Sequence, residues 1–444
     1  MSEALPLPPR PNLERYKKLA KDFQRACRSS NAPAIRDWAT RWVETLAGLR
    51  GLEITADLRR QLQFEAEGIE RRWHKLKKTN ERAERCALAD AQFFIAREHG
   101  FASWPKFAKH LESLARANSP ASKFESAVDA IVNGDLATLK KRLTDDPELV
   151  RARSTREHRS TLLHYVSANG VEDFRQKTPH NIVEITRLLL AAGADVNAES
   201  DAYGGRSTTL GLTATSWHPE KAGVQLALME LLLEHGAAID GPEGDSAVNG
   251  CLRNGRGKAA EFLACRGARL DLEGAPGVGR LDVVKSFFND DGSLRPPVTQ
   301  NQMQAGFAWA CEFGRTEVVE FLLTRGIDVS SMTDPMAGAT GLHWAAFERH
   351  ADIVRLLLKR GAPVDVKDRR HNGTPLEWAL YGWTNSPHKA ARTDDYEAVA
   401  LLVRAGAKPD PKWFEEVENR HSVAKAIQSD PRMMAALRGE RRRS

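Results

Sequence analysis

The sequence lacks any long apolar run. A helix that crosses a membrane needs about 18 or more apolar residues in succession, and no segment of the 444 residues approaches that length. The opening residues, MSEALPLPPR, also lack the apolar stretch of a secretory signal peptide. We therefore expect a cytoplasmic protein that has no membrane partner.

Cysteine is scarce and follows no motif. The five cysteines are odd in number and include no C-x-x-C pair, which argues against a disulfide framework and favours reduced thiols. Cys251 and Cys311 stand where a helical repeat needs a small buried residue. We therefore expect both to pack in the core.

Motifs for catalysis and cofactor binding are equally scarce. Gly277-Val278-Gly279-Arg280 resembles the start of a dinucleotide loop, but no strand precedes it and the third glycine is missing, so a turn between helices fits better. His343 and His350 lack the further ligands that zinc needs, and no nucleophile elbow, phosphate loop or Cys–His pair stands out. The sequence therefore predicts no metal, no cofactor and no catalytic residue, and it favours a non-catalytic protein.

Charge is unevenly distributed along the chain. Residues 1–120 hold 23 Lys and Arg against 15 Asp and Glu, whereas the remaining residues hold 42 against 44. A basic N-terminal end permits an acidic partner such as nucleic acid. A solvated helical surface explains the same numbers, and we favour that explanation.

What the sequence does contain is a repeated pair of short amphipathic helices. Within residues 340–368, apolar residues at i, i+3 and i+4 mark one buried face on each of two helices, and Gly361 supplies the left-handed residue that ends the second. Neither helix can bury its face alone, so the unit must stack on copies of itself. The same helix-ending pattern, an apolar run followed by glycine, occurs before Gly193, Gly236, Gly267, Gly326 and Gly406.

These units resemble ankyrin repeats, whose signature is T-P-L-H-x-A at a spacing near 33 residues. The signature reads T-G-L-H-W-A at 340–345, with looser versions at 161–165 and 374–379. The resemblance covers Phe124 to Asp410. It implies an all-α fold with short hairpin loops, an α-solenoid of about eight repeats preceded by a helical module. We predict four parts: a helical N-terminal module at 1–118, a linker at 119–123, the solenoid at 124–410, and capping helices with a basic tail at 411–444.

The N-terminal module carries two further signals. The segment from Ala89 to Trp104 looks like one found ahead of ankyrin repeats in bacterial proteins, which implies a bacterial source. Ala96 and Gly100 also have the spacing of a helix-turn-helix, whose second helix would read DNA. The apolar positions Phe107 and Leu111 fall out of that motif's phase. We therefore favour a packing or capping module, with nucleic-acid binding as the weaker alternative.

The resemblance also implies which residues face the concave groove of the solenoid. In ankyrin repeats the residue after the motif histidine points into the groove, together with the last residues of the same helix. The predicted groove residues are Tyr165, Leu212, Trp309, Glu312, Trp344, Phe347, Trp378 and Tyr381. Exposed aromatic side chains on a rigid frame are the usual anchors of a binding surface, so we expect a partner protein or peptide there. The alternative is that each tryptophan folds back and fills space in the groove.

The irregular third to sixth repeats support a second hypothesis, a small-molecule site or an enzyme. Gly250 and Gly274 occupy groove positions and would leave a bare floor, which predicts a recess. Its predicted lining consists of Arg206, Thr208, Thr209, His218, Asn249 and Glu273, beside Trp309 and Glu312. Arg206 and the threonine hydroxyls would hold a carboxylate or phosphate, and Glu273 is the candidate acid or base. A tight loop with threonine capping, and a Glu273 that caps the hairpin above it, explain the same residues without a ligand.

Two histidines keep the position of the repeat signature. In the ankyrin family the imidazole at this position normally bonds neighbouring backbone. We therefore expect His164 and His343 to be structural.

Overall fold

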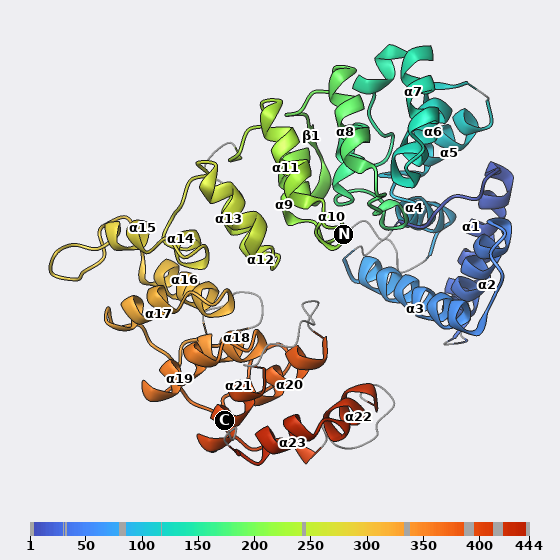
Figure 1. Ribbon diagram of the computed structural model, residues 1–444. Coiled ribbons are helices and arrows are strands. Elements are labelled where there is room, and N and C mark those ends of the chain that lie inside the picture. The colour runs from blue at the N-terminus through green and yellow to red at the C-terminus, as the bar shows by residue number, and fades with distance from the viewer. Residues whose placement is uncertain are drawn as a thin grey trace. The chain divides into compact units, whose positions relative to one another are not determined.

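The chain is built almost entirely of helices (Figure 1). The computed structural model describes residues 4–29, 31, 33–79, 86–116, 118–241, 246–332, 338–385, 395–411 and 421–440. The chain divides into two compact units, Met1–Ala238 and Ile239–Ser444, and each is described by itself. Among the described helices, none is long and apolar enough to cross a membrane.

The first unit contains eleven α-helices and one two-stranded sheet within the described residues. The α-helices are α1 Leu13–Arg28, α2 Ala34–Leu49, α3 Ala56–Thr79, α4 Leu88–Glu98, α5 Trp104–Leu114, α6 Pro120–Asn133, α7 Leu136–Asp145, α8 Ile182–Ala191, α9 Thr209–Thr215, α10 Trp217–Lys221 and α11 Gln225–Glu234. Short 3-10 helices are η2 Pro147–Arg151, η3 Leu163–Ser167, η4 Asp173–Arg175 and η5 Ala202–Gly204. Strands β1 Glu199–Ser200 and β2 Ser207–Thr208 pair antiparallel, with Glu199 opposite Thr208.

Helices α1 to α5 share one core that is rich in aromatic rings. Phe23, Trp73 and Phe94 lie within it, with ring centroids about 5 Å apart, and all three are buried. Phe107 and Leu111 of α5 are also buried there, which agrees with the packing role favoured from sequence. We call helices α1 to α5, which share this core, the helical module.

The predicted linker at 119–123 is wrong. The hydroxyl of Ser119 accepts a hydrogen bond of 3.1 Å from the backbone N–H of Ser122, and Pro120 begins α6 directly. Proline suits a first helical turn because its missing N–H has no partner there in any helix. The chain therefore passes from α5 into α6 with a capped helix start, and α5 packs against α6.

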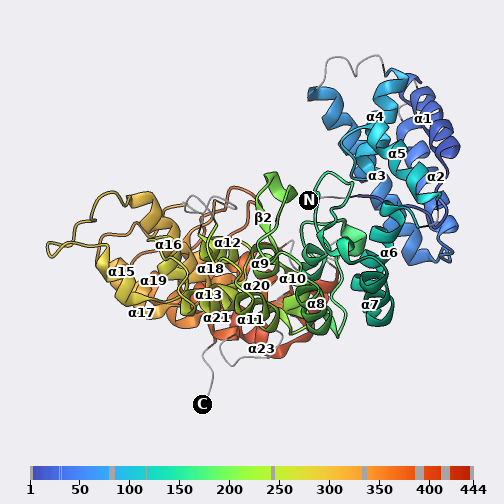
Figure 2. The same cartoon turned by 90° about the horizontal axis from the view of Figure 1, so that it is seen from above.

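The second unit consists of helix pairs that stack in two rows (Figures 1 and 2). Its helices are α12 Ala247–Arg253, α13 Gly257–Cys265, α14 Gly274–Gly277, α15 Leu281–Ser286, α16 Gln300–Glu312, α17 Thr316–Leu323, α18 Gly341–Phe347, α19 Ala351–Lys359, α20 Pro375–Asn385, α21 Asp395–Arg404, α22 His421–Ser429 and α23 Pro431–Leu437. The even-numbered helices from α12 to α22 contact one another in sequence, and so do the odd-numbered helices from α15 to α23. This stacking is the predicted all-α solenoid.

The core of the second unit runs continuously through these pairs. Leu342, Ala345, Ile353 and Leu357 are buried in it, as their spacing predicts. Cys311 is fully buried in the same core, and Cys251 is buried as well, which confirms their expected packing role. Of the predicted C-terminal cap, Ile427 is buried, whereas Trp413, Phe414, Val417 and Arg441–Arg443 lie outside the described residues.

His164 and His343 have the predicted structural role. Nδ1 of His343 accepts a hydrogen bond of 3.1 Å from the backbone N–H of Thr340, and its Nε2 donates to the carbonyl of Gly373 at 3.1 Å. His164 makes the equivalent bonds with Thr161 and Ser207, each of 3.1 Å. Each imidazole thus caps its own helix and fixes the following hairpin.

Candidate partner-binding surface

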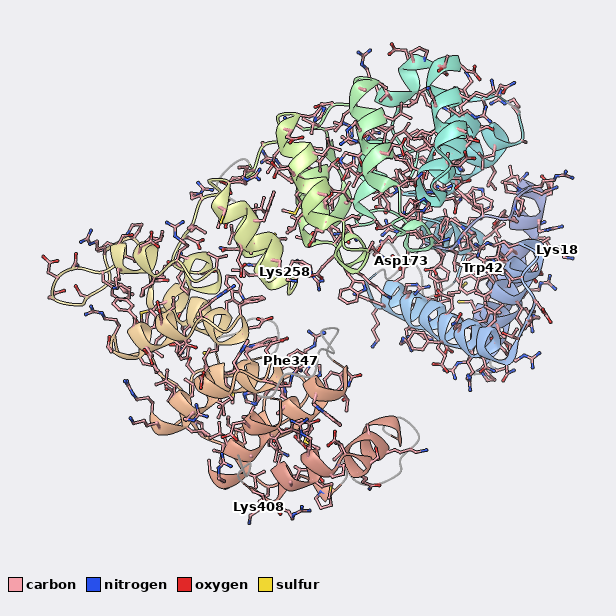
Figure 3. All side chains as sticks on the ribbon, in the orientation of Figure 1. Lys18, Trp42, Asp173, Lys258, Phe347 and Lys408 are labelled. Atoms are coloured by element: carbon pink, nitrogen blue, oxygen red, sulfur yellow. The ribbon has the colours of Figure 1, made fainter. Side chains whose placement is uncertain are left out.

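Four aromatic side chains lie together on two neighbouring helices of the second unit. Trp344 and Phe347 belong to α18, and Trp378 and Tyr381 belong to α20. The rings of Trp344 and Trp378 meet edge to face, with centroids 5.0 Å apart. Phe347, which Figure 3 labels, contacts Trp378 at 5.9 Å and Tyr381 at 6.4 Å. We call these four residues the aromatic surface.

The aromatic surface is partly open to solvent. Trp344, Phe347 and Trp378 are half-buried, because each ring rests against another. The side chain of Tyr381 is the outermost of the set, and the residue is 51% exposed. A partner that covered Tyr381 and its neighbours would therefore remove apolar ring surface from water.

A buried carboxylate holds the position of Trp378. The indole N–H of Trp378 donates a hydrogen bond of 3.0 Å to Oδ2 of Asp368. The same carboxylate accepts the backbone N–H groups of Arg370, His371 and Gly373. Burial alone would raise the pKa of Asp368, but these hydrogen bonds outweigh it and hold the pKa below its ordinary value.

Glycine lets α20 approach α18 closely at the aromatic surface. A Cβ atom at Gly382 would lie 2.2 Å from the carbonyl oxygen of Phe347. In the space that glycine leaves, the Nη1 atom of Arg349 donates a hydrogen bond of 2.9 Å to the carbonyl of Gly382. The rings of the two helices are thus fixed by backbone packing and do not depend on a partner for their arrangement.

Two predicted groove residues, Tyr165 and Leu212, are buried. Tyr165 lies in η3, where its hydroxyl faces Oε1 of Glu172 at 3.4 Å and its ring packs on Phe124. Leu212 packs over Gly170, whose Cβ would lie 2.8 Å from the Leu212 Cδ2 atom. The expectation that these two face an open groove is wrong, because Glu172 of the insertion at 171–181 lies against Tyr165 and Gly170 lies against Leu212.

Trp309 is also buried, with 8% of the residue exposed. Of the two glycines predicted to leave a bare floor, Gly250 is half-buried, and the space above Gly274 is filled by a neighbouring side chain. A Cβ at Gly277 would lie 2.6 Å from Cδ1 of Leu252 and 3.2 Å from Cβ of Trp309. A Cβ at Gly274 would lie 2.5 Å from Oδ1 of Asn249. These glycines therefore serve close helix packing.

The predicted recess residues divide between the two units. In the first unit, Thr208 caps α9 by accepting the backbone N–H of Gly211 at 3.2 Å, and Thr209 is fully buried. Arg206 is exposed, with its Nε 3.8 Å from a carboxylate oxygen of Glu199 across the β1–β2 hairpin. His218 on α10 is half-buried, and burial lowers its pKa. Helix capping accounts for Thr208, the hairpin for Arg206, and burial in the core for Thr209.

Asn249 and Glu273 belong to the second unit. The side-chain amide of Asn249 donates to Oδ2 of Asp271 at 2.8 Å. Oδ1 of Asp271 accepts the backbone N–H groups of Glu273 and Gly274, so Asp271 makes the cap that was expected of Glu273. Glu273 is half-buried, and its pKa is raised by burial and by the neighbouring Asp271.

A buried ion cluster in the first unit has no signal in the sequence. Arg156 and Arg175 are buried together with Glu125 and Glu172. Arg175 bonds Glu125 at 2.6 Å and Glu172 at 3.5 Å, and Arg156 bonds both carboxylates as well. Arg156 lies in a hairpin and Arg175 in the insertion of the second repeat, so no helical period links them. Their partners are identified only by the fold.

Charge pairing sets the protonation of this cluster. Burial alone would raise the pKa of Glu172, but Arg156 and Arg175 outweigh it and hold the pKa well below its ordinary value. The pKa of Arg175 is correspondingly raised by Glu125 and Glu172 against the effect of its own burial. The cluster is therefore a set of paired ions buried within the first unit, and paired burial of this kind serves structure more often than chemistry.

The first unit also contains a cavity of about 500 Å³, away from the predicted recess residues. Charged side chains of both signs line it, together with apolar ones: Arg72, Lys75, Arg97, Glu98, Glu157, Asp201, Phe94, Leu76 and Tyr203. Arg72 pairs with Glu98 at 2.8 Å, and Arg97 pairs with Glu157 at 2.6 Å. Among the described residues, no group of three or more His, Cys, Asp or Glu side chains is arranged to hold a metal ion.

Residues 307–413 match the family model of ankyrin repeats, which holds three copies of the repeat. The matched range begins within α16 and includes the whole aromatic surface. The family resemblance deduced from the sequence is therefore confirmed in this part of the chain.

The chain is similar to parts of larger proteins. The ankyrin repeat and KH domain-containing protein mask-1 of Caenorhabditis elegans is 26% identical over 251 residues, which cover 54% of this chain and 9% of that protein. The palmitoyltransferase Hip14 of Drosophila melanogaster is 36% identical over 100 residues, which cover 22% of this chain and 14% of that protein. The crystal structure of the human ASB11 ankyrin repeat domain is similar at 19% identity and a TM-score of 0.28, covering 56% of this chain and 100% of that one.

The chain thus spans less than a sixth of the length of either relative. Both relatives are animal proteins. The bacterial source that the segment at 89–104 implies has no support from them and remains a prediction.

Proposed function

We propose that this protein binds a partner protein or peptide through the aromatic surface of Trp344, Phe347, Trp378 and Tyr381. The observation that carries the proposal is the exposed ring of Tyr381, which lies beside three half-buried rings on the neighbouring helices α18 and α20. Ankyrin repeats at 307–413 support a protein-interaction role in general. The aromatic surface is the site that we propose for that role.

The physical basis is a set of anchors whose positions are already fixed. Tyrosine and tryptophan at the centre of an interface each contribute about 2 kcal/mol or more when they are hot spots. The Asp368–Trp378 hydrogen bond and the close approach at Gly382 hold the rings before a partner arrives, so little side-chain freedom is lost on binding. The rings would pack against apolar side chains of the partner.

Glu312 lies on α16, which packs against α18 in the row of even-numbered helices. It ends α16, and its carbonyl accepts a hydrogen bond of 2.9 Å from Nε2 of His350. Aromatic faces attract a cation. We therefore expect the partner segment to carry apolar residues and at least one Lys or Arg.

A peptide library displayed on phage and selected against the full-length protein would test the proposal. Selected peptides should be rich in apolar and basic residues. Their dissociation constants, measured by fluorescence anisotropy, should rise about tenfold or more with Tyr381→Ala, a loss of about 1.4 kcal/mol. Phe347→Ala should have a similar effect.

Phe64→Ala is the matched control, because Phe64 is an exposed aromatic residue on α3 of the first unit. This change should leave the affinities unaltered. Peptides that bind Tyr381→Ala and Phe347→Ala as tightly as the unaltered protein, while both variants keep native circular dichroism, would refute the proposal.

A further inference from the structure

Two thiols of the first unit are neighbours in the core of the helical module. Cys27 occupies the last turn of α1, and Cys86 lies just before α4. Gln24 and Arg28 of α1 both donate side-chain hydrogen bonds of 3.2 Å to the carbonyl oxygen of Cys86. Because positions 24, 27 and 28 lie within about one turn on one side of a helix, Cys27 lies on the same side of α1 as the two donors. Each thiol shifts the pKa of the other.

The two thiols have different surroundings. Cys27 is half-buried, whereas Cys86 is 1% exposed. The hydrogen bond from Cys86 lowers the pKa of Cys27, and the positive charge of Lys77 on α3 acts in the same direction. The same hydrogen bond and burial raise the pKa of Cys86. Of the pair, Cys27 is therefore the thiol that solvent reaches and the one that ionises first.

We propose that Cys27 and Cys86 form an oxidation site for a hydroperoxide, which converts the two thiols into an intramolecular disulfide. Three features carry this assignment: the hydrogen bonds that hold the Cys86 backbone against the end of α1 that contains Cys27, the access of Cys27 to solvent, and the burial of Cys86. The remaining cysteines differ, since Cys251 and Cys311 are fully buried and Cys265 is exposed on α13.

The chemistry proceeds in two steps. The thiolate sulfur of Cys27 attacks one oxygen of the hydroperoxide, the O–O bond breaks, and the other oxygen leaves as an alcohol, or as water when the oxidant is hydrogen peroxide. Cys27 is then a sulfenic acid. The sulfur of Cys86 displaces the hydroxyl group from the Cys27 sulfur, so that an S–S bond forms and the thiol proton leaves with that hydroxyl as water. Two thiols and one hydroperoxide thus give one disulfide, one alcohol and one water.

The disulfide would join the end of α1 to the start of α4. The closed loop contains residues 28–85, which include α2 and α3. Cross-linking a loop of this length restricts the unfolded chain, so the oxidised helical module should require more denaturant to unfold. Oxidation therefore changes the stability of the module.

Peptide mapping of the full-length protein tests the proposal. The reduced protein is treated with one equivalent of hydrogen peroxide, digested without reductant and examined by mass spectrometry. We expect the peptides that contain Cys27 and Cys86 to be linked, with Cys251 and Cys311 still reduced. In Cys86→Ser, Cys27 should stop at the sulfenic acid and be trapped by dimedone, because the second thiol is missing. Cys27→Ser should form no disulfide.

Cys265→Ser is the matched control and should give the same link at the same rate. Oxidation that falls on Cys265 while Cys27 and Cys86 stay reduced would overturn the assignment. So would a Cys86→Ser protein in which no dimedone adduct forms on Cys27. The map of the unaltered protein decides the question even if a serine variant folds poorly.

Discussion

The indole of Trp378 and the carboxylate of Asp368 are ten residues apart and joined by a hydrogen bond of 3.0 Å. Asp368 is 2% exposed and uses both oxygens: Oδ1 bonds the N–H groups of Arg370 and His371, and Oδ2 bonds Gly373 and Trp378. One side chain therefore shapes the loop before α20 and orients a ring of the aromatic surface.

Asp368→Ala should destabilise the protein by about 2–4 kcal/mol, because it leaves several backbone N–H groups and an indole without an acceptor. Urea unfolding followed by circular dichroism measures the change. Asp352→Ala is the control, since Asp352 is highly exposed and pairs only with Arg355 at the surface; it should cost less than about 1 kcal/mol. Equal midpoints for the two variants would contradict the assigned role of Asp368.

Gly382→Ala should destabilise the second unit by about 1–3 kcal/mol, since the added Cβ would lie 2.2 Å from the backbone oxygen of Phe347 and would force α18 and α20 apart. Intrinsic tryptophan fluorescence should shift as Trp344 and Trp378 separate. Gly48→Ala, in α2, is the matched change, because nothing lies within 4 Å of its Cβ position. That substitution should be neutral or stabilise by up to about 1 kcal/mol. If the Gly382 variant unfolds at the same urea concentration as the unaltered protein, the close approach has no energetic importance.

The helix pairs could be predicted from the sequence because their signals are local. Leu342 and Ala345, or Ile353 and Leu357, lie one turn apart on a single helix, and their spacing alone marks a buried face. The capping roles of His164 and His343 were predictable for the same reason, since Thr161 and Thr340 stand three residues earlier.

The site was predicted less well because exposure depends on residues that are distant in sequence. The rule that the residue after the motif histidine faces the groove correctly placed Trp344 and Trp378 at a partly open surface. The same rule failed at Tyr165, which lies against Glu172 of the insertion at 171–181. Glycine signals were misread in a similar way. Position 274 has no room for a Cβ atom because the Asn249 side chain occupies that space. Only the packed structure shows that neighbour.

Lowering the pH from 6.5 toward 4 should destabilise the first unit through its buried histidines. Burial lowers the pKa of His99 to about 3 and those of His110 and His164 to about 4, from an ordinary 6.5. Since the unfolded chain takes up these protons first, the stabilising effect of each neutral imidazole is fully present above pH 6.5 and declines as the pH falls toward the folded pKa. At pH 5 the loss is about 2 kcal/mol for each group.

His164→Gln tests this pH dependence at one position. Glutamine can accept the N–H of Thr161 and donate to the carbonyl of Ser207, but it does not titrate. Urea unfolding at pH 8 and pH 5 should show a difference in stability that is smaller by about 2 kcal/mol than in the unaltered protein. An identical difference in both proteins would show that His164 is not protonated on unfolding.

Arg175→Met should destabilise the first unit by about 3–5 kcal/mol, because it leaves Glu125 and Glu172 buried with half of their positive charge removed. Methionine keeps much of the apolar stem, so the measured loss reports charge pairing and not cavity formation. Arg151→Met is the matched control, since Arg151 and its partner Glu148 are both highly exposed; it should cost less than about 1 kcal/mol. Urea unfolding at pH 7, followed by circular dichroism, compares the two. A loss below about 1 kcal/mol for Arg175→Met would mean that the buried carboxylates take up protons or water without penalty. It would also mean that Arg175 does not hold the insertion at 171–181 against α6, the helix that carries Glu125.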